Sequence, residues 1–211
     1  MTARKYLVKY LHPILKANGF IYQKPFWMTD SSKPWRVAIE TTSGKFQDGR
    51  WFLDMDIGFF SYEIDGITDA QARQFKCERR DLPLGVITSH FQSSIFSLDE
   101  DADWSLRKDP GPFFHTDSDM ELAIKKMSVK FINILPKLIE KYANYEALID
   151  CKNNSIGTEA KGKKAGLFAA AASVLLQRYD EAEVFLAENI RPGSSSYDKK
   201  IGVALSQMIP R

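Results

Sequence analysis

Charged residues with strand-like spacing are the strongest candidates for chemistry in this 211-residue chain. Two segments, residues 35–42 and 51–60, alternate in polarity, and successive side chains of a strand point to opposite faces. If these segments pair as a hairpin in a suitable register, four charges share one face: Arg36, Glu40, Asp54 and Asp56. Paired carboxylates beside a guanidinium can bind a cation, anchor a polar ligand or transfer protons as acid and base.

Other interpretations of this face stay open. One face of an antiparallel sheet is often wet, and its charges then form cross-strand ion pairs without further function. Three aromatic residues share the parity of the aspartates: Phe52, Phe60 and Tyr62. The face is then either a half-open pocket with carboxylates on its floor, or a surface covered by the C-terminal helices, which needs fewer assumptions. Arg79 and Arg80 could supply an anion-binding fork, although surface ion pairs with Glu78 and Asp81 are a simpler interpretation.

Standard catalytic and cofactor motifs do not occur in the sequence. The chain has no Gly-x-Ser-x-Gly nucleophile elbow, no Gly-rich phosphate loop and no Cys/His spacing of a metal site. Its three histidines are scattered, at positions 12, 90 and 115. We therefore expect no cofactor and no metal, we assign no catalytic residue, and we predict that Cys77 and Cys151 are buried or half-buried thiols.

Composition and charge narrow the class of protein. The net charge is +2 and the pI is about 8.4, without the basic stripe or the pI above about 9 that marks nucleic-acid binders. No apolar run approaches the roughly 18 residues that cross a bilayer, and Lys9 and Lys16 interrupt any signal-peptide core. We predict a soluble cytoplasmic protein with no membrane contact. Nucleic-acid binding is a minor hypothesis, resting on Lys161, Lys163 and Lys164.

The charge is distributed unevenly along the chain. Lys and Arg exceed Asp and Glu by four in residues 1–60 and again in residues 121–211, whereas residues 61–120 have a balance of −6. The acidic run at residues 99–103 is a solvated loop in its simplest interpretation. The alternative is that it recruits a basic partner or a divalent cation.

The hydrophobic pattern predicts an α+β fold: an antiparallel β-meander with an N-terminal helix and a C-terminal helical subdomain. An amphipathic helix is predicted at residues 3–18, with Gly19 as its cap and a kink or break at Pro13. Further elements follow in order: strands at residues 20–28, 35–42 and 51–60, a short helix at 68–75 and a strand at 104–106. Residues 76–98 have no clear pattern.

The chain is predicted to be helical after Thr116. Asp117, Ser118 and Asp119 are candidate caps, and Pro136 predicts a kink or a join between helices. Later helices are predicted at residues 145–151, 158–178, 180–189 and 197–208. We divide the chain into an α+β domain, residues 1–144, and a helical hairpin subdomain, residues 145–211, that packs on or beside it.

One segment of the helical part resembles a tetratricopeptide-type hairpin. It runs from Ala169 to Leu186, with small residues that allow close helix approach and Tyr179-Asp-Glu-Ala182 at the turn into the second helix. A solenoid needs about three repeats, and only one is found. An ordinary packed hairpin is therefore favoured over a peptide-binding groove.

The N-terminal motifs resemble a bacterial protein family. Leu11-His-Pro-Ile-Leu-Lys-Ala-Asn-Gly-Phe20, the aromatics Phe26 and Trp35, and Phe52-Leu-Asp-Met-Asp-Ile-Gly58 occur in the order of the family catalogued as domain of unknown function 4304. Glu78-Arg-Arg-Asp-Leu82 and Trp104 resemble its later positions, whereas Ile39-Glu-Thr-Thr-Ser departs from the expected glutamine. The resemblance covers about residues 1–150. It implies an α+β domain in a bacterial cytoplasm, without an established activity, cofactor or catalytic residue.

Two classes of function follow from these observations. The first is a non-catalytic binding or protein-interaction module of a bacterium, of an immunity or accessory type, whose partner is a protein or a small polar ligand. The alternative is a small hydrolase or ligand-binding enzyme that uses Arg36, Glu40, Asp54 and Asp56 on the sheet face. The oligomeric state is not predictable from the sequence.

Overall fold

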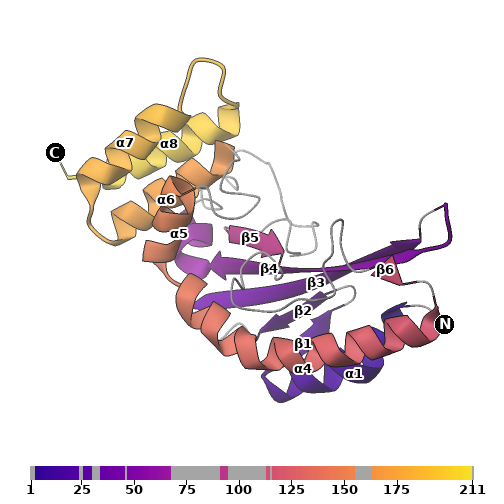
Figure 1. Cartoon of the computed structure of the whole chain (residues 1–211). Helices are drawn as coiled ribbons and strands as arrows, with labels where there is room; N and C mark the ends of the chain where they lie inside the picture. Colours follow the sequence, from indigo (N-terminus) through magenta and orange to yellow (C-terminus); the bar gives the residue numbers. More distant parts are fainter. Residues whose placement is uncertain are drawn as a thin grey trace.

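The computed structural model of the chain describes residues 3–23, 26–29, 34–45, 47–67, 91–94, 113–114, 116–154 and 163–210. The fold is α+β, as predicted, with an antiparallel sheet, an N-terminal helix and C-terminal helices (Figure 1). The first half contains α1 (Ala3–Ala17), β1 (Phe20–Gln23), β2 (Phe26–Thr29), β3 (Trp35–Lys45), β4 (Trp51–Ser61), β5 (Phe91–Ser94) and β6 (Phe113–Phe114). The second half contains α4 (Asp117–Tyr142), α5 (Tyr145–Asn153), α6 (Lys163–Leu175), α7 (Tyr179–Asn189) and α8 (Ser196–Met208).

The sheet is a meander in the order β1-β2-β3-β4-β5, and β6 also pairs with β4. Every pairing is antiparallel. The prediction of one strand over residues 20–28 is wrong, because the chain reverses between Gln23 and Phe26 and the two halves pair as β1 and β2. Prolines cannot donate a ladder hydrogen bond, so Pro25 is a poor residue for the middle of a strand.

Alternation along β4 directs one face of the sheet into the core. Leu53, Met55, Ile57 and Phe59 are at most 2% exposed, as expected for residues of one parity. We call this side the odd face and the opposite side the even face. Figure 1 shows α1 and α4 side by side beneath the sheet, and their apolar residues join the odd face in one core.

The helix ends follow local sequence signals. α1 ends at Ala17, and Gly19, two residues later, has a φ of +83°, the left-handed conformation that favours glycine just after a helix. We expected a kink or a break at Pro13, and the break is not observed, since α1 continues through it. α4 likewise continues through Pro136 as one helix. Its N-cap is Thr116 rather than the three residues after it, because the Thr116 hydroxyl accepts a hydrogen bond from Asp119 N at 3.1 Å.

The C-terminal helices lie beyond the end of the sheet where β3 begins (Figure 1). α6 packs against α5, α7 and α8, and its four consecutive alanines, residues 169–172, are fully buried. The core is continuous from the odd face through α4 into these helices. None of the described helices is long and apolar enough to cross a membrane.

Several predictions fall outside the described residues. These are the helix at residues 68–75, the strand at 104–106, the acidic run at 99–103, Lys161, Cys77, Arg79 and Arg80. The described ranges add three elements that the sequence pattern did not indicate: β5, β6 and a helical turn at residues 62–67 directly after β4.

Candidate functional site

The β3–β4 register determines which predicted site residues meet. Glu40 lies directly opposite Asp56, and Asp54 lies opposite Thr42. Arg36 lies opposite Phe60. Because a strand rises about 3.3 Å per residue, Arg36 and Glu40 are separated by about 13 Å along β3. The predicted group of four charges is therefore divided into a carboxylate end and an Arg36 end of the even face.

The even face has a buried apolar centre. Met28, Ala38 and Phe60 are at most 3% exposed and form a small cluster that is separate from the main core. We had expected the C-terminal helices to cover this face. Among the described residues they do not, because the cluster contains no residue of α5–α8. Glu40 and Asp56 are half-buried at its border. Within the described residues, this buried apolar cluster separates the carboxylates from Arg36.

Arg36 and Tyr62 meet where β3 begins and β4 ends. Tyr62 N donates to Pro34 O at 3.3 Å, which holds the turn after β4 against the start of β3. The Arg36 guanidinium carbon lies 4.9 Å from the centre of the Tyr62 ring. This is a cation–π arrangement, in which the ring face attracts the positive charge. Arg36 Nε and Tyr62 Oη are both buried and have no hydrogen-bond partner within the described part of the chain.

A second polar cluster lies at the same end of the sheet, on the side of α5. The Tyr145 hydroxyl donates to Glu63 and lies 3.2 Å from the buried hydroxyl of Ser61. The Tyr145 ring packs against Trp35 at 5.3 Å between ring centres. Burial, together with the bond to Glu63, raises the pKa of Tyr145 to about 12. The sequence did not indicate this cluster, because 84 residues separate Ser61 from Tyr145.

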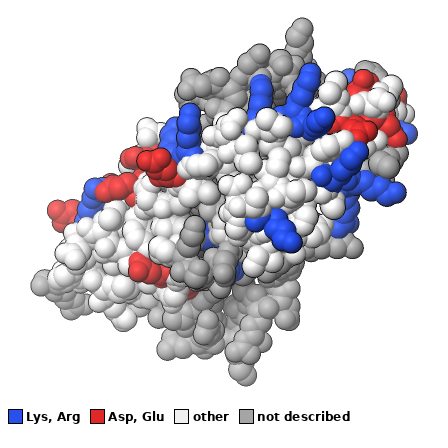
Figure 2. Space-filling model, turned by 90° about the horizontal axis from the view of Figure 1, so that it is seen from below, with Lys and Arg blue, Asp and Glu red and all other residues white. Residues whose placement is uncertain are grey.

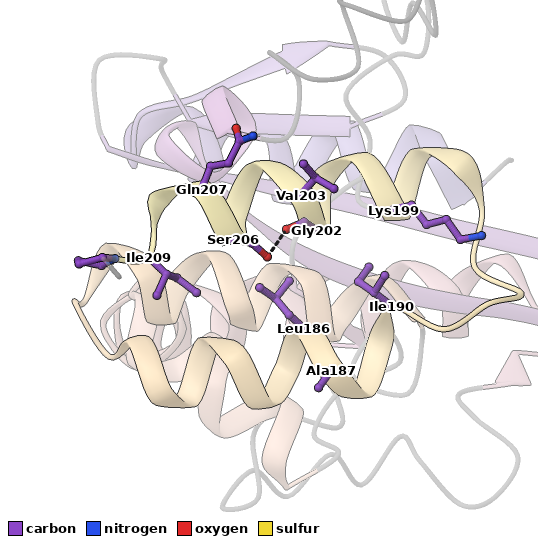
Figure 3. Close-up of a pocket in the computed structure, with 10 residues that line it drawn as sticks. Leu186, Ala187, Ile190, Lys199, Gly202, Val203, Ser206, Gln207 and Ile209 are labelled. Carbon is purple, nitrogen blue, oxygen red and sulfur yellow. Dashed lines mark hydrogen bonds between the residues drawn. The ribbon is translucent and has the colours of Figure 1, made fainter.

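A groove lies between α7 and α8 (Figure 3). Its volume is about 850 Å³. Apolar residues of both helices and of the chain end line most of it: Leu186, Ala187, Ile190, Val203, Ile209 and Pro210. Lys199, Ser206 and Gln207 supply the polar part of the lining. Figure 3 shows Leu186 of α7 and Ile190, the C-cap of α7, directed toward α8.

Two glycines allow the close helix packing on which the groove depends. A Cβ atom on Gly202 would lie 2.8 Å from Ile190 Cγ1, so α8 approaches α7 at Ile190 only because residue 202 has no side chain. A Cβ atom on Gly166 of α6 would lie 2.0 Å from Asn189 Nδ2 at the end of α7. The predicted hairpin of residues 169–186 is thus observed as α6 and α7, and a groove lies between α7 and α8.

The outer surface of α1 and α4 is basic. These two helices carry nine Lys and Arg against four Asp and Glu, a balance of +5. In Figure 2, which views the molecule from below, blue side chains surround a largely white centre. One of the acids is neutralised locally, because Glu121 accepts from Lys9 Nζ at 2.8 Å and from the Tyr10 hydroxyl. The bond from Lys9 holds the pKa of Glu121 below its usual value, with Tyr10 as the second cause.

Metal-binding and nucleophilic side chains are scattered over the described residues. Within the described ranges, no three His, Cys, Asp or Glu side chains come together in a way that could hold a metal ion. Cys151 is 3% exposed, which confirms the prediction of a buried thiol, and burial raises its pKa to about 12. His12 Nδ1 accepts a hydrogen bond from Trp27 Nε1 at 3.1 Å. That contact ties α1 to β2.

The described structure therefore offers three features that could bind another molecule: the Arg36–Tyr62 pair, the groove between α7 and α8, and the basic surface of α1 and α4. The carboxylate pair of Glu40 and Asp56, at the other end of the even face, is a fourth feature of this kind. Comparison with known proteins adds no assignment, since no protein-family model, no curated protein and no solved structure matches the chain.

Proposed function

We propose that the protein is a non-catalytic interaction module that binds a helix of a protein partner in the groove between α7 and α8. The observation that carries this proposal is the apolar lining of a hollow of about 850 Å³ at the surface. The immunity or accessory role, the bacterial cytoplasm and the resemblance to domain of unknown function 4304 stay predictions from the sequence.

The shape of the groove favours a helix as its occupant. It lies between two helices, and helix-in-groove recognition uses apolar anchors at positions i, i+3 or i+4, and i+7. Val203 lines the groove from α8 and is 59% exposed, and Ala187 lines it from α7 and is also exposed. Apolar side chains with this exposure on neighbouring helix turns lose contact with water when an amphipathic helix packs on them.

The charge of α7 favours a basic partner helix. α7 carries four acidic residues and no basic residue: Asp180, Glu181, Glu183 and Glu188. Glu183 is exposed and lies four and seven residues before Ala187 and Ile190, so it shares their side of α7 at the edge of the groove. A Lys or Arg beside the apolar anchors of the partner would meet this carboxylate.

The proposal can be tested with selected peptides, because no partner needs to be known in advance. A library of helix-forming peptides is panned against the full chain, and the affinity of the selected peptides is then measured by fluorescence anisotropy. We expect basic amphipathic sequences whose affinity falls at least tenfold in Val203→Arg, since the new guanidinium fills the groove and repels the peptide. Circular dichroism checks that the variant is folded.

A matched control variant separates this effect from a general change of surface. Val129 of α4 is 57% exposed, almost the same as Val203 at 59%, but it lies on the basic surface instead of in the groove. Val129→Arg should leave the affinity of the selected peptides within about twofold. Peptides that bind Val203→Arg as well as the original chain, or that respond equally to both variants, would contradict the proposal.

A small hydrolase or ligand-binding enzyme is the second candidate, and the direct opposition of Glu40 and Asp56 favours it. Two neighbouring carboxylates can take separate acid and base roles when their surroundings differ. An enzyme of this kind should hydrolyse at least one member of a panel of esters, phosphate esters and glycosides. Glu40→Gln should then reduce the rate by a factor of about 10² or more. A panel without any turnover contradicts this candidate and leaves the interaction module unaffected.

A further inference from the structure

The Arg36 end of the even face has the donors of an anion site. The β3–β4 register places Trp35 opposite Ser61 and Arg36 opposite Phe60. Tyr62, which follows Ser61 in the chain, lies against the Arg36 guanidinium. The guanidinium carbon lies 4.9 Å from the centre of this ring, close enough for the ring face to attract its charge. Arginine arranged in this way presents a fork of N–H donors in a fixed direction.

Two of the donors at this position are unsatisfied. Arg36 Nε and Tyr62 Oη are each buried, and neither has a hydrogen-bond partner among the described residues. Leaving a buried donor without an acceptor is costly, and folded proteins contain few such groups. Two of them on neighbouring side chains are therefore better explained by one shared acceptor than by two independent defects.

The described carboxylates do not supply that acceptor. Glu63, the residue next to Tyr62, accepts instead from Tyr145 on the other side of the sheet end. Glu40, the nearest acid along β3, is four residues and about 13 Å away from Arg36. Arg36 consequently keeps a positive charge without an ion pair in the described part of the chain.

We propose that Arg36 and Tyr62 bind the carboxylate group of a small organic acid, with Arg36 Nε–H and Tyr62 O–H donating to its oxygens. A carboxylate has one negative charge and two acceptor oxygens in a plane, which matches one guanidinium and two donors. A phosphate dianion calls for more donors and more positive charge than this pair supplies. The site is independent of the groove between α7 and α8, and neither proposal depends on the other.

Nuclear magnetic resonance of the arginine Nε–Hε groups tests the site directly. The full ¹⁵N-labelled chain is titrated with sodium acetate at constant ionic strength, with sodium chloride as the balancing salt. We expect the Arg36 Nε–Hε signal to move downfield and to saturate, because the group gains an acceptor. Tyr62→Phe removes one donor and keeps the ring, so it should weaken acetate binding about three- to tenfold.

Two other arginines serve as internal controls. Arg50 Nε already donates to Asp48 Oδ2 at 2.6 Å, and Arg191 Nε donates to Glu188 O at 3.0 Å. Their signals should stay in place while that of Arg36 moves. Arg36→Lys identifies the Arg36 signal by its loss, and circular dichroism verifies that each variant is folded.

Four outcomes would overturn the proposal. The first is an Arg36 signal that lies downfield before acetate is added, which would reveal an acceptor within the chain. The second is an equal shift of all arginine signals, which indicates a general ionic effect. The third is tighter binding of inorganic phosphate than of acetate. The fourth is an acetate affinity that Tyr62→Phe leaves unchanged.

Discussion

Replacement of Gly166 by alanine should destabilise the protein, although a change from glycine to alanine inside a helix usually stabilises it. Alanine is favoured over glycine inside a helix by about 0.8–1.0 kcal/mol. Gly166 is buried in α6, however, and a Cβ atom there would lie 2.0 Å from Asn189 Nδ2 and 2.2 Å from Asn189 Cγ. Real Cβ atoms do not approach this closely, so the Asn189 side chain must move.

The size of the effect follows from what Asn189 loses. Its Nδ2 donates to Phe185 O at 2.7 Å, and a hydrogen bond of this kind contributes about 0.5–1.5 kcal/mol. Forcing an extra methyl group into a packed region costs about 1–3 kcal/mol. After the gain in helix propensity is subtracted, Gly166→Ala should lower the free energy of unfolding by about 2 kcal/mol. For a chain of this size that corresponds to about 4–8 °C in Tm.

A double-mutant cycle isolates the contact. In an Asn189→Ala background the obstructing side chain is absent, so Gly166→Ala should instead raise the free energy of unfolding by about 0.5–1 kcal/mol. Urea denaturation followed by circular dichroism measures all four proteins, with the slope of the transition checked for constancy. Gly66 is the control position, because a Cβ atom there meets nothing within 4 Å.

The reversal of sign is the decisive result. If Gly166→Ala stabilises the original chain, α6 and α7 are not packed as closely as the short distance between Gly166 and Asn189 indicates. Destabilisation that persists in the Asn189→Ala background would place the obstruction elsewhere. Either result would also count against the groove between α7 and α8, because α7 forms one of its walls.

Two further predictions concern the start of α5. Asn144→Ala should lower the free energy of unfolding by about 1 kcal/mol, because the Asn144 side chain caps α5 by accepting from Ala147 N at 2.8 Å; Asn144→Asp should keep most of the stability in the same urea experiment. Stability should also fall as the pH rises from about 10 to about 12. Burial raises the pKa of Tyr145 in the folded chain to about 12 from its ordinary value of 10.0, so the neutral phenol is the form that folding favours. Ultraviolet titration of the phenol, compared with Tyr145→Phe, measures this pKa, and a Tyr145 titration near pH 10 in the folded chain would contradict the burial and the Glu63 bond.

The local pattern of apolar and polar residues correctly predicted those helices and strands that bury one of their faces. Leu53, Met55, Ile57 and Phe59 alternate with polar or small residues, and this period is enough to identify β4 and its buried side. The amphipathic helix at the N-terminus and the cap at Gly19 are signals of the same local kind. The prolines inside α1 and α4 do not end these helices, because the effect of a proline inside a helix depends on packing that the sequence pattern does not contain.

The candidate sites depend on contacts between distant residues, which local patterns cannot supply. The parity of Arg36 and Glu40 was predictable, but their separation from the other charges depends on the register, and a shift of two residues would preserve the parity while changing every neighbour. Tyr145 reaches Ser61 across 84 residues. The groove likewise requires Gly202 of α8 to meet Ile190 of α7, and a single glycine in a helical pattern carries no information about its neighbour.

The division of the charges bears on the choice between binding and catalysis. Acid–base catalysis needs its groups within hydrogen-bond reach of one reacting centre, about 2.6–3.2 Å from each. Arg36 and Glu40 are about 13 Å apart along β3, with buried Ala38 between them, so one small substrate cannot engage both at a single reacting centre. A catalyst on this face would have to use Glu40 and Asp56 without the guanidinium. Binding requires less, because the Arg36–Tyr62 pair and the groove between α7 and α8 each offer a complete local surface, and this favours a binding protein over an enzyme that uses the predicted four charges.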